Sequence, residues 1–238
     1  YNLKLVDKGN TGSKIGSIVH LILEVLTNKR HKKHYNSIVG ANDIFIVPSI
    51  KRLVKKHVLR QDLNSSEYVD MIKDMSLKGL KYDFFGNEFG EPDESFSEVE
   101  FNLDVNEDGK KYSVKGFIDR LFLYKSKGLA LIRDFKSSKK KFEGKELENN
   151  LQHTIYTLAV KRLYPDYEKV RVEFLFLKFM EDGTEDGIIK MPEISTSETS
   201  GEEYVLTEWQ NLAEAFNEEY AVSNMAANQG FPKDGSFS

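Results

Sequence analysis

Residues 116–136 contain two apolar segments separated by a short polar turn at residues 125–128. This pattern predicts an antiparallel β-hairpin. If the turn is centred on its two middle residues, Asp119 in the first strand lies directly opposite Asp134 in the second. A register shift of one residue would instead send the two carboxylates to opposite faces of the sheet. The register of this hairpin therefore decides whether the two acids can act together.

In the predicted register the two carboxylates stand side by side, because directly opposite residues hold their Cβ atoms about 4.5–5.5 Å apart. Lys136 points to the same face, since it lies two residues beyond Asp134. The other side chains of that face are apolar: Phe117, Leu121, Leu123, Ala130 and Ile132. Adjacent carboxylates on an apolar surface resist ionisation unless a cation neutralises them, which indicates a divalent-metal site. The alternative is a pair of ordinary polar residues at the frayed end of a hairpin.

Both acids belong to short motifs. Gly-x-x-Asp-Arg ends at Arg120, Asp-x-Lys ends at Lys136, Gln-x-x-x-Tyr follows at residues 152–156, and Gly-x-x-x-His precedes them at residues 16–20. Together the four motifs resemble the RecB-like branch of the PD-(D/E)XK nuclease superfamily, as a cluster-free relative of the CRISPR-adaptation and RecB/AddB-type exonucleases. The resemblance implies an α/β (α+β) fold: a central mixed β-sheet with an antiparallel meander, flanked by helices, in a restriction-endonuclease-like core.

The resemblance also implies a metal cofactor. It assigns His20, Asp119 and Asp134, with the backbone carbonyl of Phe135, to the binding of Mg²⁺ or Mn²⁺, and a neutral imidazole suits Mn²⁺ better. Taken alone, a histidine beside an apolar helical stripe is commonly a hydrogen-bonded boundary residue. Glu24 lies one turn beyond on the same flank. It either orients the imidazole or binds metal through water, or it is a solvated acid.

Lys136, Gln152 and Tyr156 complete the catalytic set that the resemblance implies around the two aspartates. Lys136 would orient the attacking water or stabilise the transition state. Gln152 and Tyr156 lie four residues apart on a predicted helix and therefore project from one side of it. In the family this pair contacts the substrate strand or braces the lysine. Taken alone, both are typical boundary residues.

Two basic segments are candidates for DNA contact. The loop with Lys139, Lys140 and Lys141 directly follows the proposed site and suits phosphate binding, although a solvated turn explains the same composition. A basic amphipathic helix over residues 51–60 either lines a nucleic-acid channel or presents a solvated face. Since the 238-residue chain carries a net charge of −4, binding to nucleic acid has to come from such local patches.

The composition excludes several kinds of covalent and metal site and indicates where the protein is located. The sequence has no cysteine, which excludes a disulfide, a thiolate zinc site and a cysteine-ligated iron–sulfur cluster within it. Iron–sulfur relatives follow a Phe-Pro segment like that at Phe231 with a cysteine cluster, so we expect a cluster-free member rather than an incomplete chain. With no signal-peptide pattern and no apolar run of ~20 residues, we expect a cytoplasmic protein without membrane contact, bacterial or phage-encoded.

The remaining pattern predicts one domain over residues 1–238, with a helical insertion at about residues 35–95. After an irregular lead-in over residues 1–12, we expect helices at 13–30, from Pro48, and at 64–80, 145–163 and 206–222, with Ser13 and Asn64 as N-caps. We expect strands at 96–105, from Tyr112, and at 170–179, the last parallel to the Asp134 strand. Loops are predicted at 86–95 and 181–203, with an Asp-Gly hairpin turn at 106–110.

For two side chains in these elements the sequence leaves two interpretations open, and for a third it predicts a structural role. Glu98 and Glu100 lie close enough to join the acidic site, but the alternation of their strand explains them equally well. Trp209 is expected in the core rather than as a base-stacking platform.

The leading hypothesis is a metal-dependent deoxyribonuclease, by resemblance an exonuclease, that hydrolyses phosphodiester bonds in DNA repair, recombination or phage DNA processing. A helicase or recombination partner stays open. One alternative is a non-catalytic nucleic-acid-binding or scaffolding protein that retains the fold, and another is a hydrolase of a different phosphate ester. The complete His, Asp, Asp and Lys set argues against the binder, because a binder does not need two repelling acids.

Overall fold

The computed structural model describes residues 10–148, 150–182 and 184–227. The predicted irregular lead-in lies outside the described residues up to residue 9, as does the Phe-Pro segment at Phe231. At residues 11 and 12 the lead-in prediction is wrong, because the first helix has already begun there.

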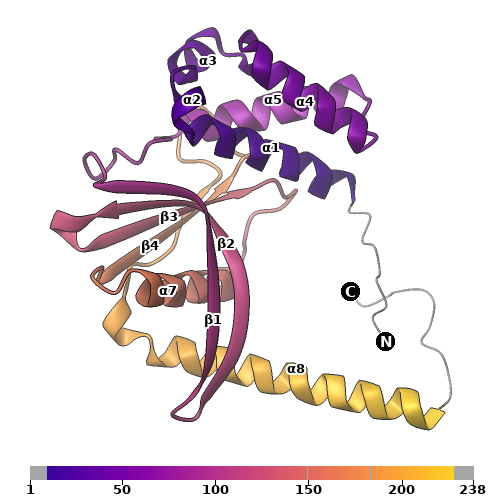
Figure 1. Ribbon diagram of the computed structural model, residues 1–238, viewed down its shortest axis with the longest axis vertical. Helices are drawn as coiled ribbons and strands as arrows, with labels where there is room; N and C mark the ends of the chain where they lie inside the picture. The colour runs from indigo at the N-terminus through magenta and orange to yellow at the C-terminus, as the bar shows by residue number, and fades with distance from the viewer. Residues whose placement is uncertain (1–9, 149, 183, 228–238) are drawn as a thin grey trace.

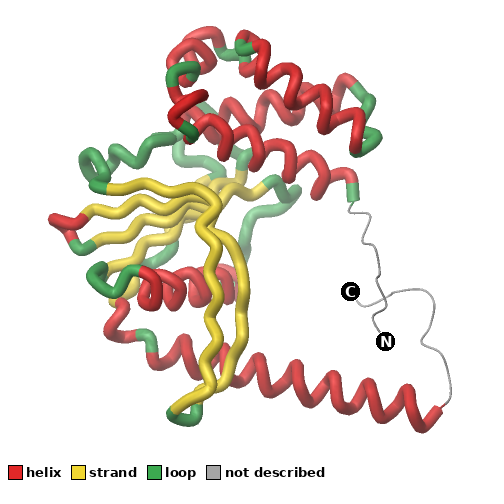
Figure 2. Tube along the Cα trace, viewed as in Figure 1, coloured by secondary structure: helices red, strands yellow, loops and turns green. Residues whose placement is uncertain are grey.

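Six strands form a mixed sheet (Figures 1 and 2). They are β1 (Glu94–Glu107), β2 (Lys110–Tyr124), β3 (Leu129–Lys136), β4 (Lys169–Phe176), β5 (Ile188–Lys190) and β6 (Ile194–Ser195). β1, β2 and β3 form an antiparallel meander, and β4 lies parallel to β3. β5 and β6 both pair antiparallel with β4. The predicted mixed sheet with an antiparallel meander is confirmed.

The turn between β2 and β3 sets the register on which the site depends. Gly128 ends this turn with a left-handed φ of 58°, a conformation that glycine adopts without a Cβ penalty. The ladder then pairs residues as far as Arg120 opposite Arg133, which is the predicted register. One residue further along, Asp119 is in line with Asp134.

The β1–β2 hairpin is closed by the predicted Asp-Gly turn. Asp108 and Gly109 have φ values of 52° and 75°, and two consecutive left-handed residues match the right-handed twist of the flanking strands. The hairpin is the longest in the sheet and curves away from the other strands (Figure 1).

Helices cover both faces of the sheet (Figure 1). One side carries α1 (Thr11–Thr27), α2 (Lys29–Lys32), α3 (Tyr35–Ala41), α4 (Pro48–Arg60) and α5 (Ser66–Lys81), and the other carries α6 (Lys145–Glu148), α7 (Leu151–Leu163) and α8 (Ser200–Ala227). The first group shares an apolar core with Phe135 and Leu175 of the sheet. The second group shares a core with Leu121 and Ile132. That residues 35–95 form an insertion stays a prediction.

Three helix boundaries differ from the predicted ones because other side chains cap them. Asn10, not Ser13, is the N-cap of α1, since its side chain accepts a hydrogen bond from the Ser13 amide at 2.9 Å. Ser65, not Asn64, caps α5. The predicted helix at 145–163 is broken into α6 and α7, because Asn150 caps the second part by accepting from the amide of His153.

The region predicted as an acidic loop at 181–203 instead contributes β5, β6 and the start of α8. The prediction for Trp209 is also wrong, because its side chain is 58% exposed. α8 packs against the β1–β2 hairpin over its early turns, where Leu206 and Thr207 are buried and Glu203 pairs with Lys110 at 2.8 Å. Leu212, one turn beyond Trp209, is likewise exposed.

Candidate active site

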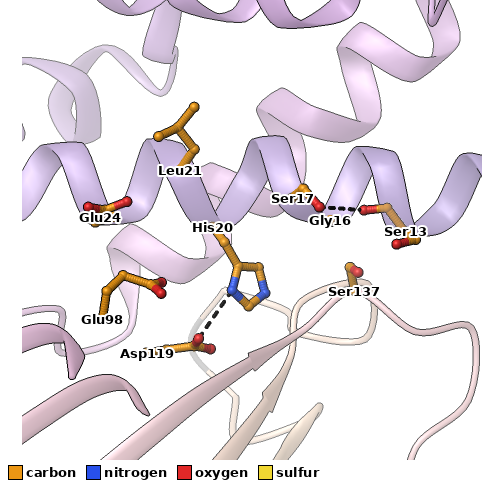
Figure 3. A pocket seen from close by; sticks show the side chains of 9 residues that line it. All are labelled: Ser13, Gly16, Ser17, His20, Leu21, Glu24, Glu98, Asp119 and Ser137. Carbon is orange, nitrogen blue, oxygen red and sulfur yellow. Dashed lines mark hydrogen bonds and ion pairs between the residues drawn. The ribbon is translucent and has the colours of Figure 1, made fainter. Parts of the chain in front are cut away.

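His20 is positioned by α1, whose apolar stripe is buried in the core beneath the helical layer. It lies beside that stripe and faces the sheet (Figure 3). One turn earlier, Gly16 allows α1 to approach the loop after β3, because a Cβ at this position would collide with Ser137 Oγ. The Gly-x-x-x-His spacing thus has a steric reason: the glycine brings the helix close, and the histidine then reaches the strand.

Asp119 lies where β2 and β3 stop pairing. Beyond the last pair of the ladder, the backbone N–H of Phe135 donates to Asp119 Oδ2 at 2.7 Å. The other oxygen, Oδ1, lies 3.2 Å from His20 Nδ1 (Figure 3). The carboxylate therefore connects α1 to β3 and is held from both sides.

Asp134 is buried, with 4% of its surface exposed. Its Oδ1 accepts hydrogen bonds from the Tyr156 hydroxyl at 2.6 Å and from Gln152 Nε2 at 2.8 Å, both on α7. Its Oδ2 lies 2.8 Å from Lys136 Nζ but has no aligned hydrogen bond within the described residues. One oxygen is thus satisfied by neutral donors, and the other faces a cationic group.

Lys136 is held beside Asp134 by a second contact. Its Nζ donates to Gln152 Oε1 at 2.5 Å and lies 5.2 Å from the centroid of the Phe174 ring. Gln152 therefore bridges the acid and the lysine, with its amide N–H on one and its carbonyl on the other. The structure brings together Asp134, Lys136, Gln152 and Tyr156, as the motif spacing predicts.

Glu98 was left open by the sequence, and the structure brings it to the site. One ligand atom each from His20, Glu98 and Asp119 lie within 4.8 Å of one another. Glu98 has a left-handed φ of 51°, which costs a non-glycine residue roughly 1–3 kcal/mol. Glu100, in contrast, is exposed and pairs with Lys115 at 2.5 Å. The signal that could have found Glu98 is its register with Asp119 across the Asp-Gly hairpin.

Burial and mutual repulsion perturb the titration of these groups. Burial disfavours the imidazolium of His20, but the hydrogen bond and charge of Asp119, with smaller contributions from Asp134 and Glu98, outweigh it and raise its pKa to about 8. Burial and then the charge of Asp119 raise the pKa of Asp134, and the same two causes raise the pKa of Glu98. The site therefore holds surplus negative charge, which favours either bound protons or a bound cation.

Two clefts meet at this site. The first, of about 440 Å³, is lined by Ser13, Gly16, Ser17, His20, Leu21, Glu24, Glu98, Asp119 and Ser137 (Figure 3). The second, of about 660 Å³, shares Ser13 and Ser137 with it and contains the side chains of Lys136, Lys139 and Lys178. Burial and the charge of Lys139 lower the pKa of Lys178. An acidic cleft therefore opens beside a basic one.

The predicted loop lysines have different surroundings. Lys139 lines the basic cleft, Lys140 is exposed, and Lys141 Nζ lies 5.7 Å from the centroid of the Phe179 ring. Glu24 lines the acidic cleft, on the same helix as His20. Of the three loop lysines, Lys139 is the one that lines the basic cleft next to the acidic one.

The strand residues next to the acids form a second charged group on the opposite face, here called the arginine cluster. Arg133 is 1% exposed; its Nε donates to Glu173 Oε2 at 2.7 Å, and its Nη2 lies 3.0 Å from Asp83 Oδ2. Arg120 donates to the carbonyl of Phe84 at 3.1 Å. The sequence motif contained Arg120, but nothing in it indicated the partners of Arg133.

The fold and this site define an α/β protein with a histidine and a group of carboxylates at one end of a mixed sheet. The family model described as "PD-(D/E)XK nuclease superfamily" matches residues 1–236, and the chain belongs to this superfamily. The expected restriction-endonuclease-like fold is thereby confirmed. Nucleases of this superfamily use divalent metal ions. Membership in a nuclease superfamily also implies a nucleic acid as the substrate.

No curated protein matches the sequence. A solved structure described as "Crystal structure of SSO0001" is 13% identical and aligns over 94% of this chain and 86% of its own, with a TM-score of 0.33. Within the described residues, no helix combines the length and apolar character that a membrane span requires.

The residues present fit a divalent cation. Imidazole nitrogen and carboxylate oxygen are ligands that Mn²⁺ accepts, and carboxylates alone suit Mg²⁺. The clustered ligand atoms of His20, Glu98 and Asp119 and the incompletely bonded, buried Oδ2 of Asp134 both place acceptor atoms where a cation would relieve repulsion.

Proposed function

We propose that this protein is a Mg²⁺- or Mn²⁺-dependent deoxyribonuclease of the RecB-like branch, acting as an exonuclease in DNA repair, recombination or phage DNA processing. The observation that carries the proposal is the 3.2 Å contact between His20 Nδ1 and Asp119 Oδ1. It joins the motif on α1 to the motif on β2 beside two further acids. A protein that only bound DNA would gain nothing from holding like charges together.

His20, Asp119, Asp134 and the backbone carbonyl of Phe135 are the proposed metal ligands. A bound cation would lower the pKa of a water molecule and neutralise charge on the scissile phosphate. The protein holds Asp119 through the Phe135 amide and Asp134 through α7. Both carboxylates are therefore oriented before substrate arrives, which limits the reorganisation that catalysis requires.

Lys136 and its partners supply the remaining chemistry. Gln152 and Asp134 hold the Lys136 ammonium from two sides, at 2.5 and 2.8 Å, so its charge is directed at the acids. In that position it would orient the attacking water and stabilise the charge of the pentacovalent transition state. Tyr156 donates to Asp134, and burial followed by the charge of Asp134 raises the pKa of Tyr156, so the hydroxyl keeps its proton.

The basic cleft supports DNA as the substrate. Phosphate contacts by lysine position a strand without reading its sequence, and Lys139 and Lys178 lie in the cleft that adjoins the acids. We propose that Lys139, Lys140 and Lys141, with Gln152 near the acids, contact the strand that is cut. The expected strand contact by Tyr156 is not proposed, because its side chain is 3% exposed and its hydroxyl holds Asp134. Because the net charge of the protein is negative, this local patch would have to attract the DNA.

The test is digestion of linear DNA labelled at either end, and of circular DNA labelled internally, each supplied as single or double strands with Mg²⁺, Mn²⁺ or EDTA. We expect cation-dependent release of label from linear DNA only. A metal site contributes several kcal/mol to transition-state stabilisation, so Asp119→Ala should lose about 10³-fold in rate. Lys136→Ala should lose about 10²–10³-fold.

Glu100→Gln is the matched control, because Glu100 is exposed and pairs with Lys115 away from the acids. It should cut DNA at the wild-type rate. Equal DNA loss with wild type and both active-site variants would refute the catalytic assignment. DNA binding without cleavage under any condition would instead support the scaffolding alternative, and cleavage of circular DNA would identify an endonuclease.

A further inference from the structure

The register of the β1–β2 ladder places Glu98 opposite Asp119. The pairs on either side are Ser97 with Arg120 and Val99 with Ile118, although Glu98 and Asp119 do not themselves form a ladder pair. The β2–β3 register brings Asp134 into the same line. Three acids, one from each strand of the meander, thus stand side by side at the same level of the sheet.

The Glu98 carboxyl is directed into the acidic cleft, toward the imidazole of His20 (Figure 3). Ligand atoms of His20, Glu98 and Asp119 lie within 4.8 Å of one another. Asp134 is not part of this group, because its carboxylate is held by Tyr156 and Lys136. Asp119 therefore belongs to two neighbouring groups of metal-binding side chains. The group toward α1 also contains His20 and Glu98, and the group toward α7 also contains Asp134.

Glu98 has no hydrogen-bond or ion-pair partner among the described side chains, although it is half-buried. Its neighbour on the strand, Glu100, is exposed and yet has Lys115 at 2.5 Å. A half-buried carboxylate that faces a second carboxylate is unfavourable without a cation. The α1 side thus offers an imidazole nitrogen and two carboxylates in a cleft of about 440 Å³ that opens to solvent, where a hydrated cation can enter.

We infer that Glu98 is a metal ligand, and that His20, Glu98 and Asp119 bind one divalent cation without requiring Asp134. This inference rests on the proposed nuclease function, which it deepens by dividing the ligands between two positions. Asp134 and the carbonyl of Phe135 then serve the position on the other side of Asp119. At Glu98 the backbone leaves the regular strand conformation, with a φ of 51°, and the side chain lines the acidic cleft.

Direct titration of the intact protein with Mn²⁺ tests the inference in the absence of DNA, with free Mn²⁺ followed by electron paramagnetic resonance. Loss of a ligand should weaken the tightest site in Glu98→Gln at least about tenfold, since even outer partners of metal ligands contribute 10–100-fold. Glu100→Gln should bind within about twofold of wild type. Asp134→Asn should retain the tightest site.

A second variant protects the test against a folding defect. Asn tolerates a left-handed φ better than other non-glycine residues, so Glu98→Asn keeps the backbone conformation while withdrawing the carboxylate. It should weaken Mn²⁺ binding as Glu98→Gln does, while urea unfolding of both variants without metal matches wild type. Wild-type Mn²⁺ affinity in either folded variant would overturn the inference, as would loss of all tight binding in Asp134→Asn.

The nuclease function and the role of Glu98 as a metal ligand can be refuted separately. If wild-type protein cuts DNA and Glu98→Gln binds Mn²⁺ normally, the nuclease function stands and the role of Glu98 is refuted. If wild-type protein cuts no DNA with any metal while Glu98→Gln still loses Mn²⁺ affinity, the three-residue metal site stands and the nuclease proposal fails.

Discussion

The two faces of the β2–β3 hairpin carry opposite charges, and these charges are balanced within the protein to different degrees. Asp119 and Asp134 share one face, where Asp119 contacts His20 of α1 and Asp134 contacts Tyr156 of α7. The residues beside them, Arg120 and Arg133, lie on the opposite face. Each arginine of the cluster has an acceptor within the protein, and Arg133 has the buried carboxylate of Glu173 at 2.7 Å. On the acid face, negative charges outnumber the cations that oppose them.

The difference shows in the titration of each side. The charges of Glu173 and Asp83 outweigh burial and raise the pKa of Arg133, so the charge of this arginine is balanced within the protein. Burial and the charge of Arg133 lower the pKa of Arg120 to about 10. On the acid face burial and repulsion raise the pKa of Asp134, so its charge is destabilised until a cation arrives. One face therefore stabilises the fold, and the other is prepared for a ligand.

Among the variants that test this difference between the two faces, Arg133→Met should show the largest change, a loss in the free energy of unfolding. Removing one partner of a buried ion pair leaves an uncompensated charge on Glu173 and typically costs about 3–5 kcal/mol. On the acid face, Asp119→Asn should change the free energy of unfolding by less than about 1 kcal/mol, because relief of repulsion offsets the weakened hydrogen bonds. Urea unfolding without metal measures both; equal losses would remove the distinction between the faces.

A smaller effect should come from metal. A ligand that binds only the folded state at 100 times its Kd stabilises by about 2.7 kcal/mol, so excess Mn²⁺ should raise the free energy of unfolding of wild type and EDTA should reverse the gain. Asp119→Asn should not respond, whereas Arg133→Met should retain most of the gain despite its lower baseline. If the response to Mn²⁺ vanishes in Arg133→Met and persists in Asp119→Asn, the cation binds on the face that carries the arginine cluster, and the assignment to the acid face is wrong.

The smallest effect concerns the helix that supports the acid face. His153 on α7 is 6% exposed, and burial lowers its pKa to about 4. The unfolded chain, with a pKa near 6.5, then binds more protons below that pH, so stability falls as pH falls from 6.5 toward 4. Between pH 6.5 and 5.5 the contribution is about 1 kcal/mol. His153→Leu should lose correspondingly less stability over this interval, and an unchanged slope would show that α7 is hydrated there.

The local features of the site follow from the amino-acid sequence alone. The apolar alternation and the polar turn define the register of β2 and β3, which puts Asp119 in line with Asp134, and side-chain period two then places Lys136 beside the second acid. Helical spacing likewise places Gln152 and Tyr156 on one side of α7. These relations depend on neighbours a few residues apart or on a tight turn, so they can be derived by counting.

The contacts between distant segments, in contrast, become visible only in the folded protein. Nothing in the spacing shows that α1 approaches β2 closely enough for His20 to contact Asp119, that Glu98 leaves its strand conformation, or that Arg133 finds Glu173. The exposure of Trp209 has the same origin, because α8 buries Leu206 and Thr207 against the hairpin and leaves Trp209 outside this contact. Such contacts depend on how whole layers pack against each other, and packing is a collective property of the core that no short segment encodes.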